Sequence, residues 1–200
     1  NQDHLDCVRK HLGAHFRMTA DVIFTPEDFS EEGFFWQGWS PIGDAEEPFT
    51  GTFDGNGHKI VGLYQNTAAS EIAYMGLFGY TDSASIKNLS MDGSAFTLST
   101  TKGSAYAGGI VGDNTGTVRN CWNTGDVYAK TNCAGGIAGS NIKYSGNTVP
   151  VVENCWSTGS VTPVEKSAVG GIVGRSKDSS QNNCYSVMKP VGQIQDENGV

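Results

Sequence analysis

Short apolar segments recur along this chain at regular intervals, and each has the length of a strand rather than of a helix. A glycine-rich element occurs four times: GLFG from Gly76, GGIVG from Gly108, GGIAG from Gly135 and GGIVG from Gly170. A second element follows each copy and begins at an asparagine: Asn88, Asn120, Asn154 and Asn183. Successive asparagines lie 32, 34 and 29 residues apart, a period typical of solenoids and propellers. One such unit cannot bury its own core, so we expect the units to stack.

Each unit contains three strand-length segments. In the second unit they are Ile110 with Val111, Val118 with Cys121, and Val127. A chain that makes three short strands per turn and stacks its turns about 4.8 Å apart is a parallel β-helix. Propeller blades need longer strands joined by hairpins, so a propeller is the less favoured alternative. The pattern therefore predicts an all-β fold, a right-handed parallel β-helix with about three strands per coil.

The asparagines are predicted to form one column at a corner of the coil. Ile86 and Leu89 are three residues apart, so both can be buried only if the chain bends between them, at Asn88. Asparagine tolerates left-handed backbone, and amides stacked on successive coils can hydrogen-bond to each other. We therefore expect a structural ladder made of Asn88, Asn120, Asn154 and Asn183, with ligand binding as the less favoured role.

The same alignment turns a row of cysteines inward. The equivalent positions of the four units hold Leu89, Cys121, Cys155 and Cys184. Parallel Cβ vectors on adjacent coils suit the torsion of a disulfide poorly, so we expect free, buried thiols that pack as small hydrophobic side chains. A reactive or metal-binding row is the alternative. The five cysteines include no C-x-x-C pair, and we expect no metal site and no cofactor.

Aromatic side chains occupy the next position of the repeat, which strand alternation turns outward. This position holds Ser90, Trp122, Trp156 and Tyr185. Stacked rings on a solvent-facing wall offer a flat apolar area with a polar group, which suits sugar rings or a partner surface. Trp122, Trp156 and Tyr185 are therefore the predicted ligand-binding residues. The alternative is that they only cover the wall of the solenoid.

The two ends of the chain lack the repeat. Leu5, Val8 and Leu12 lie on one helical stripe, which predicts a short helical cap over the first coil. The predicted organisation is a cap in residues 1–15, a β-helix in residues 16–192, and a tail or the beginning of a linker in residues 193–200. No apolar stretch approaches the roughly 20 residues that span a bilayer, so we expect no membrane insertion by this segment.

The charge balance narrows the classes of partner. The chain has 13 Lys and Arg against 21 Asp and Glu, a net charge of −8, which argues against a nucleic-acid partner. An acidic segment could collect calcium through its carboxylates, but a solvated loop is the favoured interpretation; its acidic residues are Glu27, Asp28, Glu31 and Glu32.

Several motifs together resemble the GLUG-motif family over about residues 16–187. They are M-T-A-D from Met18, W-S-P-I-G from Trp39, F-T-G-T-F-D-G-N-G-H from Phe49, and the repeated G-G-I-V-G and N-C-W-x-T-G. The resemblance implies a large secreted or wall-attached bacterial protein whose repeats are adhesive or spacer modules without catalysis. Similar repeats flank the protease domain of bacterial IgA-specific metallopeptidases. The first unit departs from the pattern, because Leu89 and Ser90 stand where the other units have cysteine and an aromatic residue.

These observations predict a non-catalytic, adhesin-like module on the bacterial cell surface or outside the cell. Its expected partners are a glycan or a host surface protein, and further domains of the same polypeptide; a simple stalk is also compatible. The alternative is a polysaccharide lyase or glycosidase, since β-helices also carry such enzymes. That chemistry needs convergent acids, or an acid with a cation. The alignment offers only Asp113 and Arg175, two coils apart in a column with Tyr80 and Ser140, which we expect to be a solvated pair.

Overall fold

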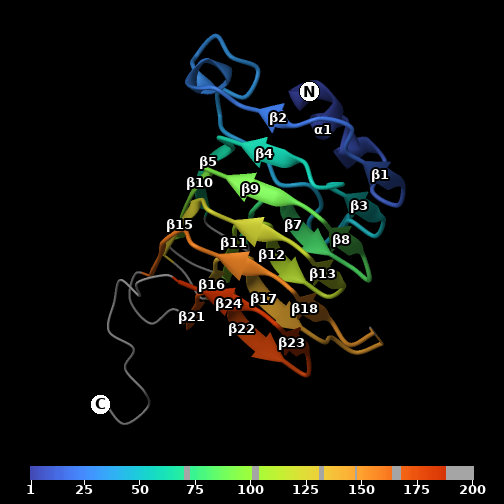
Figure 1. Ribbon diagram of the computed structural model, residues 1–200. Helices are drawn as coiled ribbons and strands as arrows, with labels where there is room; N and C mark the ends of the chain where they lie inside the picture. Colours follow the sequence, from blue (N-terminus) through green and yellow to red (C-terminus); the bar gives the residue numbers. More distant parts are fainter. Residues whose placement is uncertain (70–72, 101–103, 131–132, 147, 164–167, 188–200) are drawn as a thin grey trace.

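The computed structural model is a parallel β-solenoid of about four turns, with one short α-helix at the N-terminus in the part of the chain that it describes (Figure 1). It describes residues 1–69, 73–100, 104–130, 133–146, 148–163 and 168–187. Strands pair in parallel with their counterparts on the neighbouring coils. The predicted fold class is confirmed. The predicted tail, residues 193–200, lies outside the described residues.

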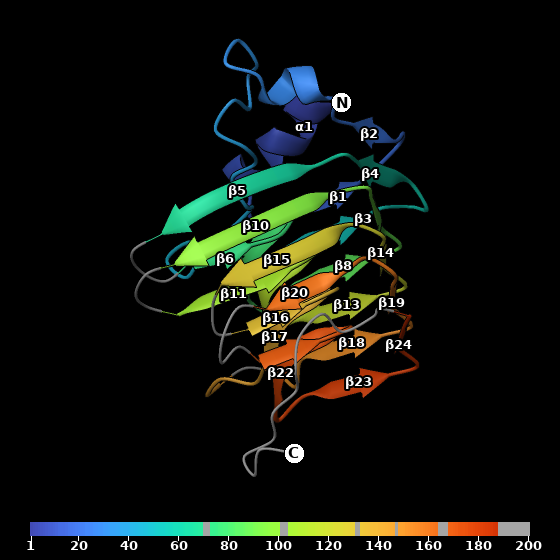
Figure 2. The ribbon, with the colours of Figure 1, turned by 90° about the vertical axis from the view of Figure 1, so that its left-hand side faces the viewer.

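Five sheets run along the solenoid and are numbered I to V in chain order (Figure 2). Sheet I consists of β1 (His15–Arg17), β3 (Thr52–Asp54), β8 (Ser85–Lys87), β13 (Thr117–Arg119), β18 (Val151–Glu153) and β23 (Ser180–Asn182). Sheet II consists of β2 (Val22–Ile23), β4 (Lys59–Val61), β9 (Ser90–Asp92), β14 (Trp122–Asn123), β19 (Trp156–Ser157) and β24 (Tyr185–Ser186). Sheet III consists of β5 (Tyr64–Ala69), β10 (Ala95–Thr100), β15 (Asp126–Lys130) and β20 (Val161–Pro163).

The remaining two sheets follow sheet III in each coil. Sheet IV consists of β6 (Ala73–Met75), β11 (Ala105–Gly108), β16 (Cys133–Gly135) and β21 (Ala168–Gly170). Sheet V consists of β7 (Phe78–Thr81), β12 (Val111–Asn114), β17 (Ala138–Ile142) and β22 (Val173–Lys177).

A full coil therefore contains five short strands, where the sequence predicted about three. Two of the three predicted segments are each divided by a corner. The left-handed residue Asn120, with φ of 52°, separates β13 from β14, and the glycine-rich turn separates β11 from β12. A bend interrupts the pairing pattern without ending the apolar segment, so the hydrophobic pattern alone undercounts the strands.

The core is built from columns of apolar side chains that the parallel register stacks on one another. Sheet I contributes the fully buried column Phe53, Ile86, Val118 and Val152. Sheet III contributes Phe96, Val127 and Val161. Each such side chain stabilises the fold by roughly 1.5–3 kcal/mol through burial. Stacking thus supplies the burial that a single unit lacks.

The N-terminal cap is a short α-helix, α1 (Gln2–Asp6), followed by a 3-10 helix over Cys7–Lys10. The Asn1 side chain accepts a hydrogen bond from the His4 amide at 3.1 Å and so caps α1. Leu5 and Val8 are buried in the core cluster, while Leu12 packs partly against it. The helix ends earlier than the predicted stripe, and its apolar residues still cover the first coil.

Candidate functional site

The aromatic strip, defined as Trp122, Trp156 and Tyr185, lies on β14, β19 and β24 of sheet II. The register pairs Trp122 with Trp156 and Trp156 with Tyr185. The two indole ring centroids are 5.8 Å apart with planes 4° from parallel, and the Trp156 and Tyr185 centroids are 6.2 Å apart at 13°. Both tryptophans are partly buried, and Tyr185 is 59% exposed. The repeat therefore places three nearly parallel rings along the solenoid axis.

The rings are stacked with an offset. Carbon atoms in contact lie about 3.5–4 Å apart, so parallel rings whose centroids are 5.8 Å apart overlap only in part. The row does not extend to the first unit as an exposed surface. Ser90 aligns with Trp122 but is fully buried, and its hydroxyl has no hydrogen-bond partner within the described part of the chain. Ser90 therefore keeps the register of the row but lacks the solvent exposure predicted for this position.

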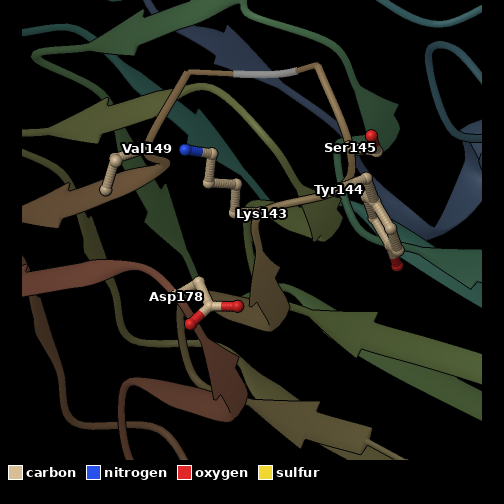
Figure 3. A pocket seen from close by; sticks show the side chains of 5 residues that line it. All are labelled: Lys143, Tyr144, Ser145, Val149 and Asp178. Carbon is tan, nitrogen blue, oxygen red and sulfur yellow. The ribbon is translucent and has the colours of Figure 1, made fainter.

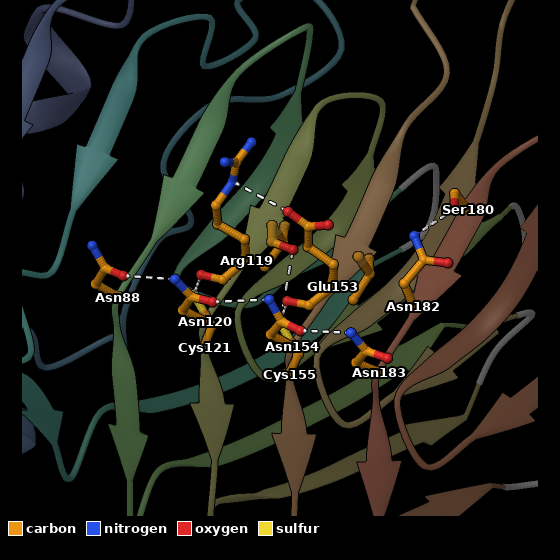
Figure 4. A network of polar contacts seen from close by, with 12 residues as sticks. Asn88, Arg119, Asn120, Cys121, Glu153, Asn154, Cys155, Ser180, Asn182 and Asn183 are labelled. Atoms are coloured by element: carbon orange, nitrogen blue, oxygen red, sulfur yellow. Dashed lines mark hydrogen bonds and ion pairs between the residues drawn. The ribbon is translucent and has the colours of Figure 1, made fainter.

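The four ladder asparagines occupy the corner between sheets I and II (Figure 4). Their φ values lie between 50° and 53°, in the left-handed region. The Asn120 amide nitrogen donates to Asn88 Oδ1 at 3.1 Å, Asn154 donates to Asn120 at 3.3 Å, and Asn183 donates to Asn154 at 3.1 Å. Each amide thus links its coil to the preceding one. The asparagine that recurs in each unit of the sequence predicted this ladder.

The structure adds a carboxylate at the first rung of this ladder. Asn88 Nδ2 donates to Asp54 Oδ1 at 2.9 Å. Burial opposes ionisation of Asp54, but the hydrogen bonds from Asn88 and from the Asn56 amide, together with the Lys87 charge, leave its pKa below the usual value. An ionised carboxylate accepts hydrogen bonds but has no hydrogen to donate, so Asp54 can end a chain in which each amide donates to the next group.

Charged side chains beside the strip and the ladder are paired with opposite charges. Arg119 Nε lies 3.6 Å from Glu153 Oε1, Lys87 Nζ lies 3.6 Å from Asp54, and Lys59 Nζ lies 3.3 Å from Asp92. Exposed pairs of this kind contribute about 0–1 kcal/mol each to stability. Their more important effect is that the wall carrying the aromatic strip has little local net charge.

The cysteine row lies directly inside this corner. Leu89, Cys121 and Cys155 are buried, Cys184 is partly buried, and the thiols are free. The Cys121 Sγ donates to the Arg119 carbonyl at 3.1 Å, and Cys155 Sγ donates to the Glu153 carbonyl at 3.2 Å. Contact with the Cys121 thiol, together with burial, raises the pKa of Cys155 to about 12. A thiol of this kind is not a thiolate at neutral pH, so it packs as a small apolar group.

Thiol labelling of the native protein is expected to modify Cys7 first, because Cys7 is exposed whereas Cys121 and Cys155 are buried. Cys121 and Cys155 should react at least about tenfold more slowly, since burial limits access to both thiols and the raised pKa of Cys155 also suppresses formation of its thiolate. Mass spectrometry after short exposure to iodoacetamide identifies the modified residues. A Cys7→Ser variant and a denatured sample provide the controls, and labelling of Cys121 as fast as Cys7 would contradict this packing.

A cluster of tyrosines on sheets IV and V was not predicted from the sequence. The rings of Tyr74 and Tyr106 are stacked with centroids 5.7 Å apart, and Tyr74 meets Tyr80 edge-on at 5.6 Å. Tyr144, in the segment after β17, donates its hydroxyl hydrogen to Asp113 Oδ2 at 2.9 Å. Burial raises the pKa of Tyr80 to about 12. The pairing of Tyr74 with Tyr106 follows the repeat period, which is the signal that could have revealed the cluster.

Asp113 lies at the centre of this cluster, and the expectation of a solvated pair with Arg175 is wrong. The predicted column is present, since Asp113 aligns with Tyr80 and Ser140, and Ser140 aligns with Arg175. However, Asp113 is only 1% exposed and accepts hydrogen bonds from the Ser140 and Tyr144 hydroxyls. Burial raises its pKa, against the effect of these two donors. This geometry makes Asp113 an anchor for the segment that carries Tyr144.

An open pocket of about 500 Å³ lies between this segment and the turn after β22 (Figure 3). Its lining residues are Lys143, Tyr144, Ser145, Val149 and Asp178.

Within the described ranges, no group of three or more His, Cys, Asp or Glu residues is placed to hold a metal ion. In the acidic segment, Asp28 accepts a hydrogen bond from the Thr25 amide at 2.7 Å and caps the 3-10 helix Pro26–Phe29.

Comparisons with known proteins agree with a repeat module. No family model matches the chain, so membership of the GLUG-motif family stays a prediction. The chain is 35% identical over 120 residues to a protein of Evansella cellulosilytica described as "Putative Gly-rich membrane protein", covering 58% of this chain and 13% of that protein. It is 33% identical over 131 residues to halomucin of Haloquadratum walsbyi, covering 62% of this chain and 1% of halomucin.

A solved structure shares the fold. It is a "putative immunoglobulin A1 protease" from Bacteroides ovatus, with a TM-score of 0.65 and 23% sequence identity over 93% of this chain and 55% of that chain. This likeness supports the solenoid architecture. Among the described residues, no helix is long and apolar enough to cross a membrane.

Proposed function

We propose that this chain is a non-catalytic module of a secreted or cell-surface bacterial protein, and that its aromatic strip binds a glycan. The observation that carries the proposal is the row of three nearly parallel rings on one wall, with Tyr185 widely exposed. The similarity to a membrane protein and to halomucin supports a location at the cell surface. The resemblance to the GLUG-motif family supports the same role.

The chemistry of the wall favours an uncharged saccharide. Partly overlapping rings leave apolar ring surface that can contact the C–H face of a sugar. The ladder amides beside the strip carry carbonyl and amide groups, which can hydrogen-bond to hydroxyls. The neighbouring charges are neutralised in pairs, and the chain as a whole is acidic, so a polyanion would gain little attraction.

Replacing both Trp122 and Trp156 with alanine is expected to weaken glycan binding at least tenfold, because two of the three rings are removed; a loss of about 1.4 kcal/mol corresponds to tenfold. A glycan array followed by calorimetry on the best ligand measures the effect. Tyr128→Ala is the matched control, since Tyr128 is an exposed aromatic residue on β15 of sheet III.

Two results would contradict the proposal. Binding that is unchanged in the Trp122→Ala, Trp156→Ala variant would remove the strip from the site. Absence of any glycan or host-protein ligand for the folded wild-type chain would favour a stalk, in which the solenoid only sets a distance between neighbouring domains.

A further inference from the structure

A second concentration of exposed aromatic residues lies at the opposite end of the solenoid, in the loop that follows the 3-10 helix Pro26–Phe29. Phe34 is 74% exposed and Trp36 is 58% exposed. Isolated exposed apolar residues are common, but two large rings separated by a single residue form a small patch. This loop is the blue segment above β2 in Figure 1.

The backbone of this loop is held in place, so the exposure of the two rings is built into the fold. The Phe35 amide donates to the Asp28 carbonyl at 3.0 Å, and the Trp39 amide donates to the Tyr64 carbonyl at 2.8 Å. Phe35 and Trp39 are buried and pack edge-on against Phe24. Phe35 is turned into the core within this turn, and its two neighbours are left exposed.

A cavity of about 250 Å³ lies between this loop and the N-terminal cap. The loop contributes Phe34, Trp36 and Gln37 to its wall, and the cap contributes Asp6 and Arg9. Pockets for drug-sized ligands range from about 300 to 1,000 Å³. This cavity is smaller, so it suits a ligand with one substituted ring rather than a larger molecule.

The polar wall of the cavity is rigid and has no net charge. Arg9 Nε donates to Asp6 Oδ1 at 2.7 Å, and the two terminal nitrogens of Arg9 donate to the carbonyls of Pro41 and Ser40 at 3.2 and 2.9 Å. The guanidinium also lies 5.0 Å from the centre of the Trp39 ring. These contacts fix the Asp6–Arg9 pair before any ligand arrives, which reduces the entropic cost of binding.

We infer that this cavity binds one uncharged pyranose ring. The exposed indole of Trp36 offers a flat apolar surface for the C–H face of the sugar. Asp6 supplies carboxylate oxygens as acceptors, whereas Arg9 and Gln37 supply donors, so the ligand must both donate and accept hydrogen bonds. Hydroxyl groups do both. A charged ligand is disfavoured because the Asp6–Arg9 pair already neutralises itself.

The inference is independent of the aromatic strip, because the two sites share no residue. It is tested by ligand-observed and protein-observed NMR titration of the whole chain with the methyl glycosides of glucose, galactose and N-acetylglucosamine. We expect saturable binding of at least one glycoside with a Kd of about 1 mM. Trp36→Ala should raise that Kd at least about tenfold, and Gln37→Ala by a smaller factor.

The Trp122→Ala, Trp156→Ala variant should bind the same glycoside with unchanged affinity, which separates this site from the strip. Three results would overturn the inference: no saturable binding of any of the three glycosides, binding that Trp36→Ala leaves unchanged, or saturable binding of glucuronate or of a phenylalanine-containing peptide in place of the neutral sugars. Thermal unfolding of each variant confirms that a loss of binding does not come from a loss of structure.

Discussion

Replacing Gly139 with alanine is expected to lower the free energy of unfolding by about 3 kcal/mol, the largest single effect that we predict for this chain. A Cβ at this position would lie 2.6 Å from the Ala107 amide nitrogen and 2.6 Å from the Gly112 carbonyl oxygen. Both atoms belong to the backbone of the preceding coil, so neither can move away by a rotamer change. The added methyl group would have to push two coils apart.

Denaturation in guanidinium chloride measures this change as a shift of the midpoint. Gly13→Ala is the matched control, because a Cβ there would meet only the Thr50 hydroxyl, at an ordinary 3.5 Å. That variant should be neutral or more stable by up to about 1 kcal/mol, since alanine reduces the freedom of the unfolded chain. Equal midpoints for the two variants would show that the close stacking of the glycine-rich turns does not limit stability.

Replacing Asn154 with alanine is expected to lower the free energy of unfolding by about 2 kcal/mol. One part is conformational, because a non-glycine residue other than Asn or Asp in the left-handed region costs roughly 1–2 kcal/mol. The other part is the loss of two amide hydrogen bonds, to Asn120 and from Asn183. Both of these bonds are exposed to solvent, so their combined contribution is about 1 kcal/mol or less.

A glycine at the same position separates the two parts, since glycine adopts positive φ without a steric cost. Asn154→Gly should therefore recover about half of the loss. Asn182→Ala is the control, because Asn182 is an exposed asparagine in ordinary strand conformation whose side-chain amide donates to the nearby Ser180 hydroxyl. If Asn154→Gly were as unstable as Asn154→Ala, the amide ladder rather than the backbone would account for the whole effect.

The two proposed binding sites differ in how far the amino-acid sequence specifies them. The aromatic strip follows from alignment of the repeats, because the position of a side chain on a strand and its partner one coil away are both set by the period. The cavity beside Trp36 lies outside the repeats. It forms only because the cap and the loop, which are separated by more than twenty residues in sequence, pack against each other and fix Arg9.

The buried groups show the same division. The column of Tyr80, Asp113 and Ser140 could be predicted from the period, but the burial of Asp113 could not. Its environment depends on Tyr144, which lies in a segment that has no counterpart in the other units. Likewise, Ser90 occupies an outward position of the repeat and is nevertheless buried.

The amino-acid sequence by itself determined the stacked coils, the corner at each asparagine and the inward row of cysteines. These features depend on periodicity and strand alternation, which act through residues one period apart. Only the tertiary structure decided which of the aligned polar residues are buried, how many strands the corners produce, and where a cavity forms. The burial of Asp113 and the cavity beside Trp36 depend on side chains from non-repeating segments, and no local pattern specifies where such segments pack. The number of strands depends on how each corner interrupts the pairing, which the hydrophobic pattern does not show.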